Sequence, residues 1–181
     1  MNQNLMKIFP IIFLTLILII AAISDIRAHK IPNWLTFSTM VTGIVFHTYT
    51  KSWEGFLFSL EGIFLGFAFL LIFYFLGGTG AGDVKLMGAV GGILGPKGVF
   101  TAFLFIALLG GIYSIILLVL HEGLKDMVKR YGKMLNTFIF TTSITYIPPE
   151  TNKGKKPVLC YGVVIALGTL LSVMRNFIYK I

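Results

Sequence analysis

Two aspartates stand where uncharged, apolar stretches of the sequence meet polar ones. Asp25 ends the first apolar run, and Asp83 follows a glycine-rich break and begins another apolar run. Ionisable groups at the edge of hydrocarbon are costly, so they are functional candidates by default. If folding brings the two carboxylates together, one takes a proton from water while the other, protonated, polarises a carbonyl. Such a pair would hydrolyse a peptide bond without a metal or a cofactor, and neither is predicted here.

A structural interpretation of the same two residues is also open. Asp25 would cap a loop, and Asp83 would be the N-cap of the following helix, where a negative charge is favoured by the helix dipole. The remaining acids are not expected to take part in catalysis. Glu54 is expected in a loop, and Glu61 interrupts an apolar helix. Three others are interpreted as solvated charges: Glu122, Asp126 and Glu150.

The composition defines the class of protein that must position these carboxylates. Of 181 residues, 56% are hydrophobic and only 12% are charged, with a net charge of +8. This excludes a soluble globular domain, which carries about 25% charged residues, and it excludes a disordered chain. Cys160 is the single cysteine, which excludes a disulfide framework and is expected to act as a small apolar residue. The three histidines are too scattered to form a metal-ligand cluster.

The apolar runs predict an all-α membrane protein, a polytopic bundle of about six transmembrane helices in one membrane-embedded domain, residues 1–181. A spanning helix needs about 20 apolar residues. Polar residues 51–54, glycine-rich residues 77–82 and a turn at residues 95–98 separate several of the runs, and Pro32 opens the second helix. The predicted helices cover residues 8–24, 31–50, 55–76, 83–94, 99–120 and 157–174.

The distribution of positive charge predicts the orientation. With six spans, ten of the 15 Lys and Arg residues fall on one side, which is therefore expected to be cytoplasmic. Both termini would lie outside, and the aspartates would face the cytoplasm from the inner (plasma) membrane. Residues 121–142 resemble an amphipathic helix held by anionic membrane lipids, with a solvated loop helix as the alternative. The basic charge is interpreted as a topology signal, so no nucleic acid is expected as a partner. An N-terminal signal peptide is the less favoured interpretation of residues 7–22.

Several stretches resemble one known family. Residues 25–36, DIRAHKIPNWLT, resemble the first aspartate motif of the type IV prepilin peptidases. Residues 80–86, GAGDVKL, followed by Gly95 and Pro96, resemble the second, and contain the GxGD signature shared with presenilin-like and archaeal preflagellin peptidases. Residues 161–168, YGVVIALG, resemble the last helix of the family. The resemblance covers nearly the whole chain.

The resemblance implies a membrane aspartyl endopeptidase that serves type IV pilus assembly or protein secretion. It would remove the short basic leader of prepilin-like proteins, cutting after a glycine at the cytoplasmic face. Asp25 and Asp83 match the family's catalytic pair. Beside Asp83, a backbone poor in side chains would let an extended peptide approach the carboxylate. The residues expected to bind substrate or to support the site are Gly80, Gly82, Lys85, Arg27, Pro32 and Asn33.

The chain departs from the larger members of that family, which carry an N-terminal region with paired cysteines linked to N-methylation. This chain begins at the first helix and has only Cys160, so trimming without N-methylation is expected. Its length fits the short forms serving tight-adherence pili, and archaeal preflagellin peptidases are also short. The particular substrate and the oligomeric state stay open.

Two other functions are consistent with an aspartate pair in a membrane. A small proton-coupled transporter could use Asp25 and Asp83 as a proton relay, and a structural subunit of a secretion machine would need no chemistry. Transporters usually place such carboxylates near the bilayer midplane, often in repeated halves. Both aspartates here are predicted at one face, and the sequence shows no internal repeat.

Overall fold

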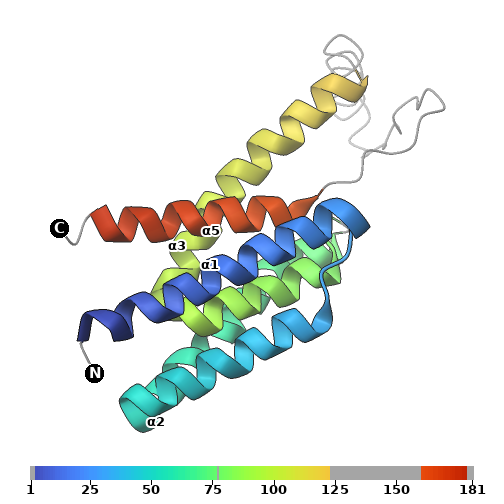
Figure 1. Cartoon of the computed structure of the whole chain (residues 1–181). Helices are drawn as coiled ribbons and strands as arrows, with labels where there is room; N and C mark the ends of the chain where they lie inside the picture. Colours follow the sequence, from blue (N-terminus) through green and yellow to red (C-terminus); the bar gives the residue numbers. More distant parts are fainter. Residues whose placement is uncertain (1–2, 77, 123–159, 179–181) are drawn as a thin grey trace, which may run out of the picture. The chain divides into compact units, whose positions relative to one another are not determined.

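The computed structural model describes residues 3–76, 78–122 and 160–178. In these residues the chain forms four helices and no strand: α1 (Gln3–Ala28), α2 (Asn33–Phe75), α3 (Ala81–Glu122) and α5 (Tyr161–Ile178) (Figure 1). Three stretches are long and apolar enough to cross a membrane, namely Ile8–Ala28, Asn33–Phe75 and Ala81–Leu117, while α5 supplies the shorter apolar stretch Tyr161–Arg175. The described residues are therefore consistent with the prediction of an all-α membrane protein, and the number of membrane crossings stays a prediction.

Helices α2 and α3 each contain one residue at which the backbone leaves the helical conformation. In α2 it is Ser52, with φ 52° and ψ −133°, and the chain turns back on itself there (Figure 1). In α3 it is Gly95, with φ 71°, a value that glycine adopts without strain. Pro96 follows at once, because the first turn of a helix does not need its N–H. The predicted break at 51–54 and turn at 95–98 were too long, and Glu54, expected in a loop, lies in α2.

Other helix ends differ from the predictions by a few residues. The first helix runs on to Ala28 rather than ending at 24, so Asp25 lies in its last turns. The second helix begins at Asn33, with Pro32 in an extended conformation (ψ 131°) just before it. The amphipathic helix predicted for 121–142 and the polar loop after it fall, from residue 123 on, outside the described residues.

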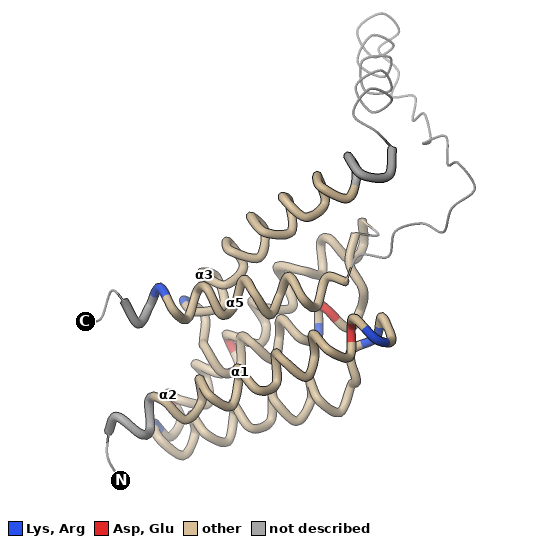
Figure 2. The backbone as a smooth tube through the Cα atoms, turned by 45° about the horizontal axis from the view of Figure 1, so that its top comes forward, with Lys and Arg blue, Asp and Glu red and all other residues tan. Residues whose placement is uncertain are grey.

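The chain divides into two compact units, residues 1–110 with 160–181, and residues 111–159. Of the second unit, the described part is the end of α3. In the first unit α1 lies beside α5 and α2, and the beginning of α1 and the end of α5 lie at the same end of the unit (Figures 1 and 2). The end of α1 and the beginning of α3 lie together at the opposite end, where acidic and basic residues gather (Figure 2). The expected single domain stays a prediction.

Glycines bring α2 and α3 into backbone contact. A Cβ placed on Gly62 would meet the backbone of Gly91, and one on Gly91 would meet the backbone of Gly62. A Cβ on Gly43, in the first half of α2, would meet the backbone of Gly92. The buried hydroxyl of Ser59 donates a hydrogen bond of 2.8 Å to the carbonyl of Gly92. Small residues allow such close approach of helices in a membrane, and here they fix the first half of α3 against both halves of α2.

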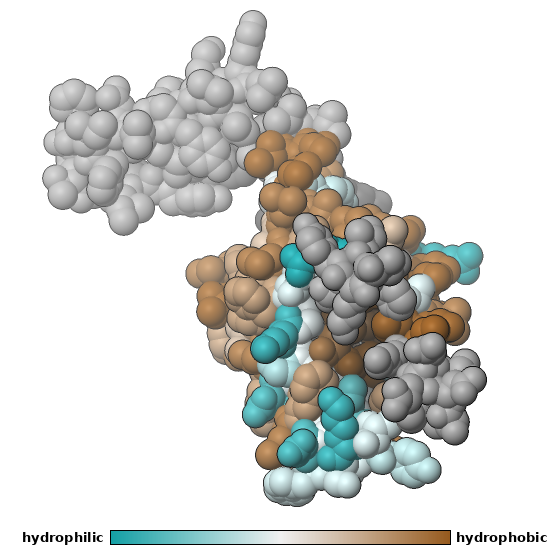
Figure 3. Space-filling view, turned by 90° about the vertical axis from the view of Figure 1, so that its left-hand side faces the viewer, coloured by the Kyte–Doolittle hydropathy of each residue, from teal (hydrophilic) through white to brown (hydrophobic). Residues whose placement is uncertain are grey.

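The flanks of the first unit are apolar. Figure 3 looks onto the end at which α1 begins, and hydrophilic residues are gathered on this face with apolar residues on either side of them. Phe9, Leu16, Phe37 and Phe64 are among the large apolar side chains that are more than half exposed. Exposure of so many large apolar side chains is expected when lipid, not water, surrounds the helices.

Candidate active site

Asp25 is buried in the last turns of α1, with 6% of its surface exposed. Its Oδ2 accepts a hydrogen bond of 2.8 Å from the backbone N–H of Gly162, in the first turn of α5. This bond joins residues 137 positions apart in the sequence. Asp25 therefore does not simply cap a loop: its carboxylate lies inside the bundle and ties α1 to α5.

Asp83 is buried in the first turn of α3, with 8% of its surface exposed. Its Oδ2 accepts a hydrogen bond of 2.9 Å from the backbone N–H of Gly80. A carboxylate at the third helical residue that reaches back to the residue before the helix is half of a capping box. The structural interpretation was thus right that Asp83 caps this helix, but Asp83 is inside the first turn and is not the N-cap.

Asp25 and Asp83 lie at the same end of the unit, where α1 ends and α3 begins. The charge of Asp25 acts on the carboxyl group of Asp83, and the charges of both act on Cys160. Each aspartate uses Oδ2 for the glycine N–H, and no hydrogen bond to either Oδ1 occurs among the residues that the structure describes. Two neighbouring carboxylates share a proton more readily than they both ionise. Two such carboxylates could supply one proton acceptor and one proton donor, and among the described residues one oxygen of each has no protein donor.

The residues predicted to support the site lie at the same end of the unit. Lys85 Nζ donates a hydrogen bond of 2.8 Å to Asn33 Oδ1, which joins the first turns of α3 and α2. Gly82 faces Ile31, whose Cβ lies 3.2 Å from where a Cβ on Gly82 would be. Arg27 is exposed near the end of α1. Pro32 precedes α2, and in the described part of the chain neither Arg27 nor Pro32 has a polar contact with the carboxylates.

Three further residues of the site were not predicted. Cys160 Sγ lies 3.5 Å from His29 Nδ1, so this cysteine is more than a small apolar residue. Tyr161 packs on Gly110, and its hydroxyl oxygen would be 3.1 Å from a Cβ there. Gly162 supplies the N–H that holds Asp25. One signal in the sequence could have pointed to Gly162. Cys160, the residue before the helix, is not a preferred N-cap, so the first N–H groups of the helix need a partner from elsewhere.

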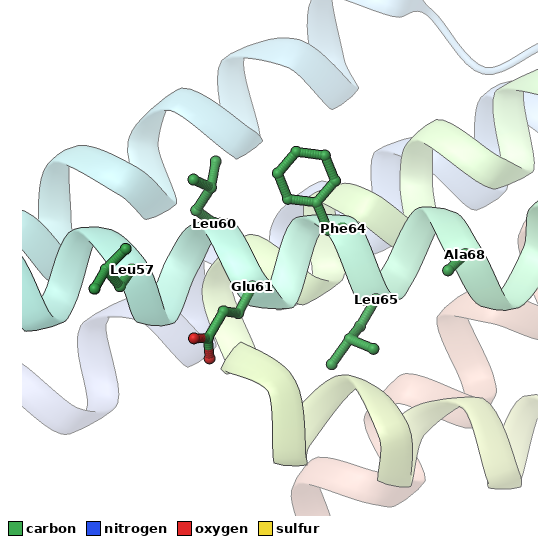
Figure 4. Close-up of a pocket in the computed structure, with 6 residues that line it drawn as sticks. All are labelled: Leu57, Leu60, Glu61, Phe64, Leu65 and Ala68. Atoms are coloured by element: carbon green, nitrogen blue, oxygen red, sulfur yellow. The ribbon is translucent and has the colours of Figure 1, made fainter.

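A groove of about 510 Å³ lies elsewhere, along the outer face of α2 (Figure 4). It contains one charged residue, Glu61, which is exposed, and neither aspartate. Its lining is otherwise apolar, from Leu57, Leu60, Phe64, Leu65 and Ala68. In the described ranges, no three His, Cys, Asp or Glu side chains gather as metal ligands would.

The fold and the site define an all-helical membrane protein with a buried pair of carboxylates. The sequence pattern of the type IV leader peptidase family matches residues 12–115, more than half of the chain, and this range includes Asp25 and Asp83. The chain belongs to that family.

A curated relative, the prepilin leader peptidase/N-methyltransferase of Bacillus subtilis (strain 168), is 33% identical over 113 residues. The aligned region covers 60% of this chain and 44% of the relative, so the chain spans less than half of that protein's length. No solved structure matches the chain significantly.

Proposed function

We propose that this chain is a membrane aspartyl endopeptidase that removes the leader of prepilin-like proteins, with Asp25 and Asp83 as its catalytic pair. The observation that carries the proposal is the burial of two carboxylates at one end of the unit, one near the end of α1 and one in the first turn of α3, in a chain of the type IV leader peptidase family. The Bacillus subtilis relative is named as a prepilin leader peptidase, which supports the substrate class.

The geometry suggests how the pair would work. A water bound between the two carboxylates would give a proton to the ionised one while the water oxygen attacks the carbonyl carbon of the scissile peptide bond. The protonated carboxyl gives its proton to the carbonyl oxygen, so that a neutral tetrahedral diol forms. When the C–N bond breaks, the leaving nitrogen receives the proton taken from the water, and the diol returns a proton to the other carboxylate. The pair ends each cycle with the single proton with which it began.

The residues around Asp83 leave room for an extended substrate. Gly78 and Gly80 are exposed in the loop between α2 and α3, and neither has a Cβ to keep a peptide backbone away. Lys85 is exposed beside this loop, with its ammonium group held by Asn33. We place the substrate across this loop, with Gly80, Gly82, Lys85, Arg27, Pro32 and Asn33 around it.

The aspartate end is proposed to face the cytoplasm from the inner (plasma) membrane. Arg27, Lys30 and Lys85 are exposed at this end, as the positive-inside rule requires of a cytoplasmic face. The beginning of α1 and the end of α5 lie at the opposite end of the unit, which supports external termini (Figure 2). The substrate would be cut after a glycine that follows a short basic leader.

Incubation with a prepilin in detergent micelles tests the proposal and separates it from the transporter interpretation. A peptidase shortens the prepilin by the mass of its leader even though no sealed compartment exists. A proton-coupled transporter would leave the mass of the prepilin unchanged under these conditions and would show proton movement only in sealed vesicles. Absence of leader removal from every prepilin co-expressed with the chain would refute the proposal.

The same mass measurement tests the prediction that no N-methylation follows the cut. The trimmed product should have the mass of the unmodified polypeptide when S-adenosylmethionine is supplied as methyl donor. A product heavier by one methyl group, with this chain as the sole enzyme added, would show that the prediction is wrong.

A further inference from the structure

The turn at the start of α5, residues 160–162, contacts α1, the residue just after α1, and α3. Gly162 bonds Asp25 of α1, Cys160 contacts His29 just after α1, and Tyr161 packs on Gly110 of α3. The charges of both aspartates also act on Cys160, and that of Asp83 acts on Tyr161. This turn is therefore a structural part of the site, although it lies far from both aspartates in sequence.

The Gly162 N–H is free to bind a carboxylate because of its position in the helix. The first four N–H groups of a helix have no partner within the helix. In most helices a Ser, Thr, Asp or Asn side chain at the N-cap binds the N–H of the second or third residue. Here Cys160 precedes the helix, and its sulfur contacts His29 instead. Asp25, from another helix, occupies the place of the missing cap.

The same position explains why residue 162 has no side chain. A Cβ on Gly162 would lie 2.9 Å from Oδ2 and 3.1 Å from Cγ of Asp25. Any other residue would therefore push the carboxylate out of its present place. Gly80 serves Asp83 in a parallel way, through a 2.9 Å bond from its own N–H. Both carboxylates are thus oriented by a glycine amide at a helix N-terminus, where the dipole also favours a negative charge.

We infer that Gly162 is a positioning residue for Asp25: its backbone N–H fixes one carboxylate oxygen, so that the other oxygen faces Asp83 and the reacting groups. This inference rests on the proposed function, because it assigns to Asp25 a role in cleavage. Hydrogen bonds to charged groups contribute about 1.5–3 kcal/mol. Loss of this bond should therefore lower kcat/KM roughly 10- to 100-fold, mostly through kcat, because the bond orients the carboxylate and not the substrate.

An amide-to-ester substitution at residue 162 removes the N–H without adding an atom near Asp25. Cys160 is the only cysteine of the chain, so a synthetic peptide of residues 160–181 can be ligated to a thioester of residues 1–159. The ester replaces an N–H that has no partner inside α5, so no hydrogen bond within the helix loses its donor. The matched control is the same ligated chain with an ordinary amide at 162.

Gly162→Ala and Gly168→Ala provide a second comparison on the same helix. Ala at 162 would crowd Asp25, whereas Ala at 168 would crowd Ile106, whose Cγ1 lies 2.6 Å from the added Cβ. We expect Gly168→Ala to lower the thermal stability but to leave kcat unchanged below the unfolding transition. Gly162→Ala should lower kcat at least as much as the ester does, and if this variant does not fold, the ester variant alone decides.

A spectroscopic measurement tests the hydrogen bond independently of cleavage. The chain has three aspartates, so ¹³C-aspartate labelling of an Asp126→Asn chain restricts the labelled carboxylate bands in the infrared spectrum to the pair. The ester should shift the band that Asp25→Asn removes and should reduce cleavage as stated. An unshifted band with cleavage at the rate of the amide control would overturn the inference. If the amide control itself does not cleave, the proposed function is wrong, and the infrared band alone then decides whether Gly162 holds Asp25.

Discussion

Lys85 Nζ donates a hydrogen bond of 2.8 Å to Asn33 Oδ1, and this bond joins the first turn of α3 to the first turn of α2. Lys85 is two residues after Asp83, and Asn33 is the residue after Pro32. Both lie at the end of the bundle where the proposed chemistry takes place. The bond between Lys85 and Asn33 therefore links the two helix starts beside the site.

A double-mutant cycle on this pair should detect the bond. Because both groups are exposed, Lys85→Met and Asn33→Leu should each lower the free energy of unfolding by roughly 1 kcal/mol. The double variant should lose little more than either single variant, since one bond accounts for both losses. The measurement is denaturant-induced unfolding in one detergent. Fully additive losses would show that the two side chains do not interact.

The glycine contacts between α2 and α3 predict where alanine is not tolerated. Gly62→Ala and Gly91→Ala should each lower the free energy of unfolding by roughly 1–3 kcal/mol. The added Cβ would meet backbone that cannot move aside without separating the helices. Gly111→Ala is the matched control, as no described atom lies within 4 Å of its added Cβ, and alanine should be neutral there or stabilising by about 1 kcal/mol. Equal thermal stability of the Gly62 and Gly111 variants would argue against the close contact.

The local features of this site could be predicted from the sequence. The charge after the first apolar run predicts that Asp25 lies at a helix end. The six residues before Asp83 include four glycines, which break a helix and so predict that the next helix begins near Asp83. Both signals are local, because they depend on which residues adjoin each aspartate. For the same reason, the predicted ends of the apolar runs beside Asp25 and Asp83, and of the glycine-rich break, lie within a few residues of those in the structure.

The non-local features could not be predicted. The bond from Gly162 to Asp25 joins residues 137 positions apart, and nothing near either residue specifies the other. The match of Gly62 with Gly91 depends on the register between two helices, which the spacing of glycines in one helix does not determine. The polar residues around Ser52 predicted a loop, whereas a single residue with φ 52° is enough to reverse the chain.

The proposed orientation can be tested by labelling single cysteines. In a Cys160→Ala background, cysteines at the exposed positions Ala28 and Lys30 should react only with reagents that reach the cytoplasm. Cysteines at the exposed positions Lys51 and Lys97 should react with impermeant reagent added outside intact cells. External labelling of position 28 would contradict the cytoplasmic site and the direction of the proposed cut.

The rate of cleavage should depend on pH in a bell-shaped manner. A pair that works with one shared proton is inactive when both carboxylates are ionised and when both are protonated. The two limbs of the profile belong to the pair and not to either residue. Activity should also survive a metal chelator, and loss in chelator that zinc restores would replace the shared-proton mechanism with a metal-assisted one.

The most direct test of the account compares Asp25→Asn, Asp83→Asn and the double variant in the removal of a prepilin leader, scored by product mass. Asparagine keeps the shape of the side chain and removes its ability to ionise. Each single variant should lose roughly 10²- to 10⁴-fold in rate with unchanged thermal stability, and the double variant should be little slower, because the two carboxylates act as one unit. Cleavage near the wild-type rate by either single variant would contradict the central claim that Asp25 and Asp83 together perform the hydrolysis.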